Sequence, residues 1–376
     1  MRTADNKNTI KDILRKNKYL RSIKRLMKTN NPTLLDRLTG SNNHLHLSLQ
    51  NTEIKFDMGK PIYLIAEEWN TNGFFAIMRK VLNGCLFSEQ MGLMPYIYII
   101  DSIYNVKGGI NGTNNMFEYY FKQPFDLKYN EIIKNYNYIM YENCHSILIE
   151  RELSGSDEKS DKPLSEYNNN YSYIQRLGDV YSRYFLIKDE LKTEFERDFE
   201  KLKKEDSKMI GIHFRGTGWE NQLYGHPNPV RIEQCVEIID EYDPKEYKYI
   251  FIATDNCAAL EYLVKKFKDR VVFYKDVTRS KDGSEVQLTL SDRERNGYYL
   301  GKEVLRDSLS LSKCEVLIAG LSQVSLFAQI QKKSRNEMYD EVHIIDNGIC
   351  NQKTIKGKKY RREVNEKAKR IVNGVG

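Results

Sequence analysis

An arginine follows the most strand-like apolar run of this sequence. The run Met209–Phe214 has the composition of a buried strand, with His213 near its carboxyl end and Arg215 directly after it, before a Gly-Thr-Gly turn at residues 216–218. A guanidinium group at a strand end, followed by such a turn, can hold a diphosphate because it offers a planar pair of donors beside free backbone N–H groups. An arginine that is ion-paired with a carboxylate fits the same pattern, so both interpretations stay open.

A second strand end carries polar side chains of a different kind. The apolar run Tyr249–Ala253 leads into Thr254 and Asp255, just before a predicted helix. Either side chain can cap that helix. In a doubly wound sheet the same position faces the ligand cleft, which is the functional alternative.

The third strand end combines a glycine with a hydroxyl group. The run Val316–Ala319 breaks at Gly320 into Ser322-Gln323 before another helix. Ser322 either caps that helix or offers its hydroxyl, beside the positive end of the helix dipole, to an anionic ligand. On the helix that precedes this strand, Asp307 either contacts a guanine edge or is a surface acid. Three strand ends in one half of the chain thus predict one nucleotide site.

Strands alternate with helices along the chain, which predicts parallel sheets covered on both faces. The expected strands are Pro61–Ala66, Pro95–Ile100, Met209–Phe214, Tyr249–Ala253, Val271–Tyr274, Val316–Ala319 and Val342–Ile345. The expected helices are Phe75–Gln90, Asp189–Glu205, Arg231–Glu241, Ala258–Lys268, Tyr298–Leu311, Val324–Lys332 and, near the C-terminus, Tyr360–Val372. The polar segment 154–167 has the composition of a loop, and we place a domain boundary near residue 206.

The excess of basic residues behind the net charge of +7 lies in the two tails. Residues 1–40 sum to +8 and residues 351–376 to +7, so the body sums to −8 and has no basic surplus to follow a phosphate backbone. Residues 8–28 form a basic amphipathic pattern, which is either a tail that is solvated or packed on the body, or a peripheral anchor on an anionic membrane. We find no secretory signal, no apolar run long enough to span a membrane, and no CxxC pair among the six cysteines.

The ordered set of motifs resembles the fucosyltransferase superfamily, and it is most similar to the α1,6-fucosyltransferases of N-glycan cores and of nodulation factors. The similarity covers residues 209–330, whereas the N-terminal half matches weakly. The matching positions are His213, Arg215, His226-Pro227, Thr254-Asp255, Asp307, Leu311-Ser312 and Ser322-Gln323-Val324.

This resemblance implies a GT-B fold, in which two Rossmann-like domains with parallel sheets face a cleft. It implies an inverting transfer of L-fucose from GDP-fucose to a glycan hydroxyl, through an α-linkage that we expect to be α1,6, without a metal ion or other cofactor. Arg215 would neutralise the leaving GDP. The expected donor-binding residues are His213, Gly216, Thr217, Thr254, Asp255, Asp307, Ser322, Gln323, Asn72 and Gly73.

The chain departs from the family pattern near Arg215. An acid and a lysine that follow this arginine in the family are missing here, and a double serine is reduced to Ser322 alone. Glu220 is the only acid between Arg215 and the His-Pro pair, so we expect it to be the general base that deprotonates the acceptor, with a solvated loop glutamate as the alternative. His226 is expected to orient the acceptor or its loop, or to be structural, and Trp69 to stack on a sugar face.

Four segments follow from this interpretation. They are a basic amphipathic segment (1–50), an acceptor-side α/β domain (51–205), a GDP-sugar-binding Rossmann-like domain (206–355) and a basic C-terminal helix or tail (356–376). Asn72 and Gly73 belong to a loop that would close over the donor, with helix capping by Asn72 as the alternative. We expect a cytoplasmic protein, with contact of its tails with the inner face of the membrane as the open alternative. Another GDP-sugar, an α1,2 linkage, or a relative that binds glycans without catalysis stay open.

Overall fold

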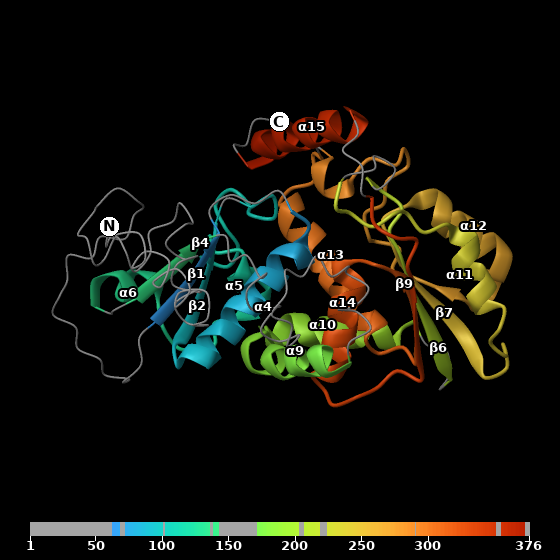
Figure 1. Ribbon diagram of the computed structural model, residues 1–376, viewed down its shortest axis with the longest axis horizontal. Coiled ribbons are helices and arrows are strands. Elements are labelled where there is room, and N and C mark those ends of the chain that lie inside the picture. The colour runs from blue at the N-terminus through green and yellow to red at the C-terminus, as the bar shows by residue number, and fades with distance from the viewer. Residues whose placement is uncertain are drawn as a thin grey trace, which may run out of the picture.

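The computed structural model describes residues 62–67, 72–100, 102–135, 138–142, 171–202, 207–218, 224–289, 291–350 and 355–372 (Figure 1). Trp69, Glu220 and the segment 1–50, with its amphipathic pattern, lie outside the described residues. No helix in the described part of the chain has both the length and the apolar character that a membrane crossing needs.

The N-terminal sheet has three parallel strands within the described residues. Strand β1 (Ile62–Glu67) lies between β2 (Met94–Ile99) and β4 (Tyr138–Glu142). Helix α4 (Phe74–Met91) connects β1 to β2 and covers one face, because alternate β1 side chains such as Tyr63 and Ile65 join the same apolar cluster as α4. Shorter elements complete this half: α5 (Phe117–Tyr120), β3 (Phe121–Lys122), α6 (Tyr129–Asn135) and β5 (Leu186–Ile187).

The C-terminal sheet has the strand order of a doubly wound nucleotide-binding fold. Its strands are β6 (Lys208–Phe214), β7 (Tyr247–Thr254), β8 (Val271–Val272), β9 (Val316–Gly320) and β10 (Glu341–Ile345). They pair in the order β10-β9-β6-β7-β8, all in parallel. The chain therefore moves outward from β6 in one direction and then returns to the other side of β6. Between β6 and β9 lies the switch point, where such sheets bind ligands at the carboxyl ends of their strands.

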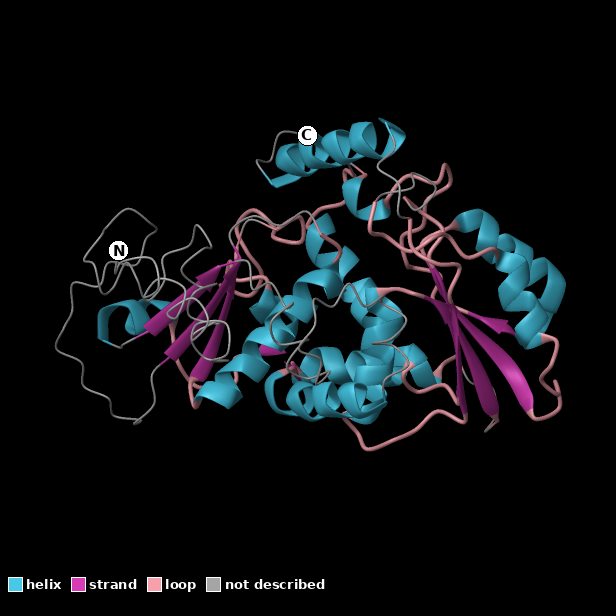
Figure 2. Ribbon diagram, viewed as in Figure 1, coloured by secondary structure: helices cyan, strands magenta, loops and turns pink. Residues whose placement is uncertain are grey.

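Helices cover both faces of the C-terminal sheet (Figure 2). On one face, Ile210 and Ile212 of β6 pack against α11 (Ile232–Ile239) and α12 (Cys257–Phe267). On the other, Met209 packs with residues of α13 (Asn296–Leu311) and α14 (Gln323–Lys333). Because side chains of a strand alternate between faces, this double cover accounts for the continuous apolar run in the sequence.

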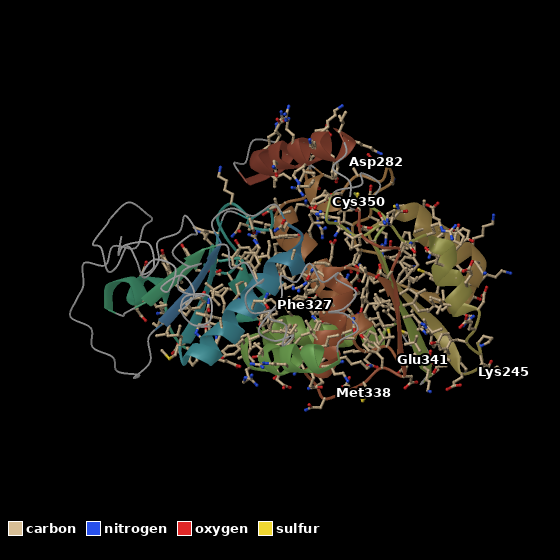
Figure 3. The ribbon with its side chains drawn as sticks, viewed as in Figure 1. Lys245, Asp282, Phe327, Met338, Glu341 and Cys350 are labelled. Carbon is tan, nitrogen blue, oxygen red and sulfur yellow. The ribbon has the colours of Figure 1, made fainter. Side chains whose placement is uncertain are left out.

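One hydrophobic core runs across the predicted domain boundary. Helices α9 (Tyr171–Tyr184) and α10 (Asp189–Glu200) lie between the two sheets together with α4, α13 and α14 (Figure 1). Phe327 of α14, near the centre of the molecule in Figure 3, packs on Phe75 of α4 with 4.6 Å between ring centroids and on Tyr181 of α9 with 6.2 Å. Because this core joins residues from both halves of the chain, it does not mark where one domain ends, and the boundary near residue 206 stays a prediction.

The predicted fold class is confirmed: the chain is α/β, with two parallel sheets and cavities at their junction, as expected of a GT-B fold. The expected strands and helices recur with ends shifted by a few residues, and the C-terminal helix α15 (Ile355–Val372) begins earlier than predicted. Strand β4, helix α9 and the shorter elements α5, β3, α6 and β5 were not predicted from the sequence.

Gly301 lies where α13 meets the N-terminal half, and we expect alanine there to destabilise the protein. Within a helix, glycine to alanine ordinarily stabilises by about 1 kcal/mol. Here a Cβ atom would lie 2.2 Å from the Tyr120 hydroxyl, which is held because it donates to the Tyr298 carbonyl at 2.9 Å. We expect Gly301→Ala to lower the free energy of unfolding by about 1–3 kcal/mol in urea titrations.

Two variants control this prediction. Gly73→Ala places its Cβ where no atom lies within 4 Å, so stability should change by less than about 1 kcal/mol. Combining Gly301→Ala with Tyr120→Phe should destabilise by less than the sum of the single changes, because the phenylalanine removes the nearest clashing atom. A stabilised Gly301→Ala protein would contradict the packing described here.

Candidate active site

The carboxyl ends of β6 and β9 meet through a buried hydrogen bond at the switch point. The Ser322 hydroxyl lies 3.1 Å from Nδ1 of His213. Burial, and then the charge of Arg215, lower the pKa of His213 to about 3, so its ring is neutral. Ser322 is also the N-cap of α14, since its hydroxyl accepts from the Ser325 N–H at 3.0 Å. The capping interpretation is therefore correct for Ser322, and the same hydroxyl also positions His213.

The turn after Arg215 is held by a carboxylate of the neighbouring strand end. Asp255 accepts from the Gly216 N–H at 2.8 Å, and its other oxygen accepts from the Thr217 hydroxyl. The expectation of a free N–H at Gly216 is thus wrong, because this donor and the Thr217 hydroxyl are both used within the protein. Asn256, and neither Thr254 nor Asp255, caps α12 by accepting from the Ala259 N–H at 2.8 Å.

This arrangement makes Asp255 a positioning residue for the Arg215 turn. Replacing it with alanine removes two hydrogen bonds, so we expect Asp255→Ala to lower the free energy of unfolding by about 2 kcal/mol. The same change should lower the affinity for any ligand that Arg215 binds. Asp255→Asn keeps one oxygen to accept from the Gly216 N–H and should lose about half as much. Chemical denaturation of both variants checks the order; equal stability of Asp255→Ala and wild type would show that the turn does not depend on this carboxylate.

Two adjoining cavities open at this edge of the sheet. The inner cavity, of about 170 Å³, lies between the start of α4, the strand ends and α13, and the larger one, of about 520 Å³, lies beneath α15. Arg215 and Gln323 line both. The other predicted residues of the inner cavity are Gly73, His213, Thr254, Asp255 and Asp307. Those of the larger cavity are Asn72, Gly73, His226 and Ser322. The described site residues are thus brought together, apart from Gly216 and Thr217, which line neither.

Asp307 is buried at the inner cavity, so the surface-acid interpretation is wrong. The residue is 6% exposed, and its Oδ1 has no hydrogen-bond partner among the described residues. Burial raises the pKa of this carboxyl to about 7, although the guanidinium groups of Arg279 and Arg306 act in the opposite direction. A buried carboxyl group with an unsatisfied oxygen at a cavity wall is suited to accept from a ligand.

Two residues of the inner cavity, Glu303 and Tyr104, were not predicted from the sequence. Glu303, one helical turn from Asp307, accepts from Arg293 at 2.5 Å and from the Thr278 N–H at 2.9 Å. Tyr104 accepts from the Phe74 N–H at 2.8 Å, which fixes the start of α4 against the cavity. The helical spacing from Asp307 accounts for Glu303, whereas no local pattern marks Tyr104, because long-range folding alone brings it to the site.

Asn72 does not cap helix α4, so the alternative interpretation of this residue is wrong. Gly73 is the N-cap residue, without a side-chain cap, and Asn72 is exposed at the larger cavity. His226 lies on the same cavity, in a segment that pairs with Cys350 through two backbone hydrogen bonds of 2.8 and 2.9 Å. Helix α15 supplies a wall that was not anticipated, with Tyr360, Arg361 and Asn365.

Comparisons with known proteins find solved structures of low similarity. No family model and no curated protein matches the sequence. The chain is similar to the solved structure of NodZ α-1,6-fucosyltransferase soaked with GDP-fucose, at 15% identity over 78% of this chain and 98% of that one, with a TM-score of 0.44. It is also similar to fucosyltransferase NodZ from Bradyrhizobium (16% identity, 73% and 92% covered, TM-score 0.40) and to POFUT1 in complex with GDP (9%, 75% and 97%, 0.39). At this identity and TM-score, these likenesses carry no argument about activity.

Proposed function

We propose that this protein is a glycosyltransferase that transfers L-fucose from GDP-fucose to a glycan hydroxyl, with inversion to an α-linkage, α1,6 in our proposal. One observation carries the proposal: Arg215, Asp307 and Ser322, which come from three separate elements, line two adjoining cavities at the switch point of a Rossmann-like sheet. Open α/β sheets bind nucleotides at this place.

The donor is assigned to the two cavities according to their chemistry. The guanine ring occupies the inner cavity, where Asp307 accepts from the N–H donors of the base. The diphosphate lies at the boundary between the cavities, where Arg215 lines both. Its guanidinium group neutralises the charge that develops on GDP as the sugar leaves, and the N-terminus of α14 adds its dipole.

Other predicted residues act in this proposal through their neighbours. Ser322 positions His213 and the first turn of α14, since its hydroxyl already makes both contacts. Gly216 and Thr217 hold the Arg215 turn on Asp255. Gln323 lines both cavities and accepts from Arg79 at 3.4 Å, and we assign it to the phosphates because it lies beside Arg215 at their boundary.

The acceptor side of the proposal relies partly on residues outside the described part of the chain. Glu220 is our proposed general base and Trp69 a proposed stacking residue. His226 lines the larger cavity and is placed to contact the acceptor. A cytoplasmic location, and contact of the basic tails with an anionic membrane, stay predictions.

Calorimetry with GDP, followed by turnover of GDP-fucose against GDP-mannose, tests the proposal. We expect GDP to bind and GDP-fucose to be consumed faster than GDP-mannose, with a labelled product on a glycan array and no change on adding EDTA, because no metal ion takes part. Faster turnover of GDP-mannose would show that the donor is a GDP-sugar other than GDP-fucose. GDP binding without hydrolysis or transfer at high protein concentration would indicate a catalytically inactive relative, and no GDP binding would refute the nucleotide site.

A further inference from the structure

Helix α15 forms a wall of the larger cavity but not of the inner one. Tyr360, Arg361 and Asn365 line the larger cavity, and none of the described residues of α15 lines the inner cavity. The volume of about 520 Å³ lies within the range of small-molecule sites. A ligand group that extends beyond Arg215 into this space therefore meets side chains of α15.

Arg361 presents a guanidinium group that the described structure does not neutralise. It is exposed, and among the residues that the structure describes none forms a hydrogen bond or ion pair with it. Burial, and then the charges of Arg215 and Arg361, lower the pKa of His226, which lines the same cavity as both guanidinium groups. A planar guanidinium group at a cavity wall is suited to bind a carboxylate or a phosphate.

The remaining charges at this cavity also favour an anion. Glu285 is the one acid that lines it among the described residues, and its carboxylate accepts from the Tyr360 hydroxyl and from Gln287. This negative charge is therefore stabilised by donors of the wall itself. Helix α15 carries eight Lys and Arg residues against two Glu, so the helix that forms this wall has a positive net charge.

We propose that the larger cavity is the acceptor site and that Arg361 binds an oxyanion, phosphate or carboxylate, which the acceptor sugar carries. This inference rests on the proposed function, in which Arg215 holds the diphosphate of the donor. It makes Arg361 a specificity-determining residue, which selects sugar phosphates or acid sugars over neutral sugars.

Ligand-observed NMR on the full chain, saturated with GDP, tests this proposal. The probes are glucose 1-phosphate, glucuronate and neutral glucose, and the variants are Arg361→Ala and the matched control Arg362→Ala, an exposed neighbour that lines neither cavity. We expect one or both anionic probes to bind at least tenfold more tightly than glucose. Arg361→Ala should abolish that preference, whereas Arg362→Ala should retain it.

Each other outcome overturns a defined part of the inference. If GDP displaces the anionic probes, the larger cavity belongs to the donor and the acceptor assignment is wrong. If Arg361→Ala instead lowers the affinity for GDP by about tenfold or more, Arg361 binds the diphosphate of the donor together with Arg215. Equal binding of glucose and its charged relatives refutes the anion site. If GDP itself fails to bind the wild type, the proposed function fails, and this measurement is independent of the probes.

Discussion

Replacing Arg215 with alanine should lower the turnover of GDP-fucose by about 10³-fold, because a single preorganised group that stabilises a developing negative charge contributes on this scale. Arg215→Lys keeps the charge but loses the planar fork, so we expect a smaller loss of about 10–100-fold. The measurement is release of GDP from GDP-fucose, with water or a glycan as acceptor.

The control for this prediction is an arginine on the opposite part of the fold. Arg197 lies on α10, is largely exposed, and among the described residues its side chain forms a 3.6 Å surface ion pair with Asp198. Arg197→Ala should keep turnover within about twofold of wild type. Unchanged turnover in a folded Arg215→Ala protein would remove this residue from the reaction, and the proposed function would then lack its main support.

Asp307→Asn should lower the affinity for GDP by about tenfold or more, and it should stabilise the free protein above pH 7. The pKa of Asp307 is raised from 3.8 to about 7 by burial. Between these two values the folded protein holds a proton that the unfolded chain has released, so its stability falls as the pH rises through this window, by a few kcal/mol in total. Asparagine carries no charge and removes this loss.

The same carboxyl group should make GDP binding dependent on pH. The N–H donors of guanine favour the ionised carboxylate, so below pH 7 GDP binding should release a proton, and affinity should rise by up to tenfold per pH unit until about pH 7. Calorimetry at several pH values, in buffers of different ionisation enthalpy, measures the released proton.

An exposed aspartate provides the matched control for Asp307. Asp292→Asn should retain wild-type affinity and the wild-type pH dependence. Proton uptake on GDP binding, or a pH dependence that survives in Asp307→Asn, would show that Asp307 does not contact the base.

Much of the C-terminal half could be predicted from its sequence, because each buried parallel strand is a short apolar run that ends in polar residues. Helix α9 was missed although Ile174, Leu177 and Tyr181 recur at the spacing of one helical face and are buried against α4 and α14. The periodic signal was therefore present in the sequence and was overlooked among the polar and aromatic residues around it. Strand β4 (Tyr138–Glu142) was also missed, although it ends in a glutamate that Asn143 follows in the sequence.

The site was predictable where a side chain follows a strand and unpredictable where folding brings distant segments together. Arg215 follows β6 and lines the cavity, as its sequence position indicated, whereas Asp307 lies within α13 and reaches the inner cavity from a helix. The residue that caps α12 is Asn256, directly after the two expected candidates, Thr254 and Asp255. Because Asn256 caps the helix, Asp255 is available to accept from the Gly216 N–H and hold the Arg215 turn. Tyr104 and Arg361 lie in segments that no local motif connects to the nucleotide site.

The core that joins the two halves also constrains how the chain acquires its structure during synthesis. Apolar side chains of the N-terminal half pack on Leu326, Phe327 and Ile330 of α14 and on Ala368 of α15. While the ribosome has not yet released these helices, the N-terminal half lacks part of its interior and exposes apolar surface. A nascent chain stalled before α14 should therefore bind chaperones and be digested by protease, and it should gain resistance only after that helix has emerged.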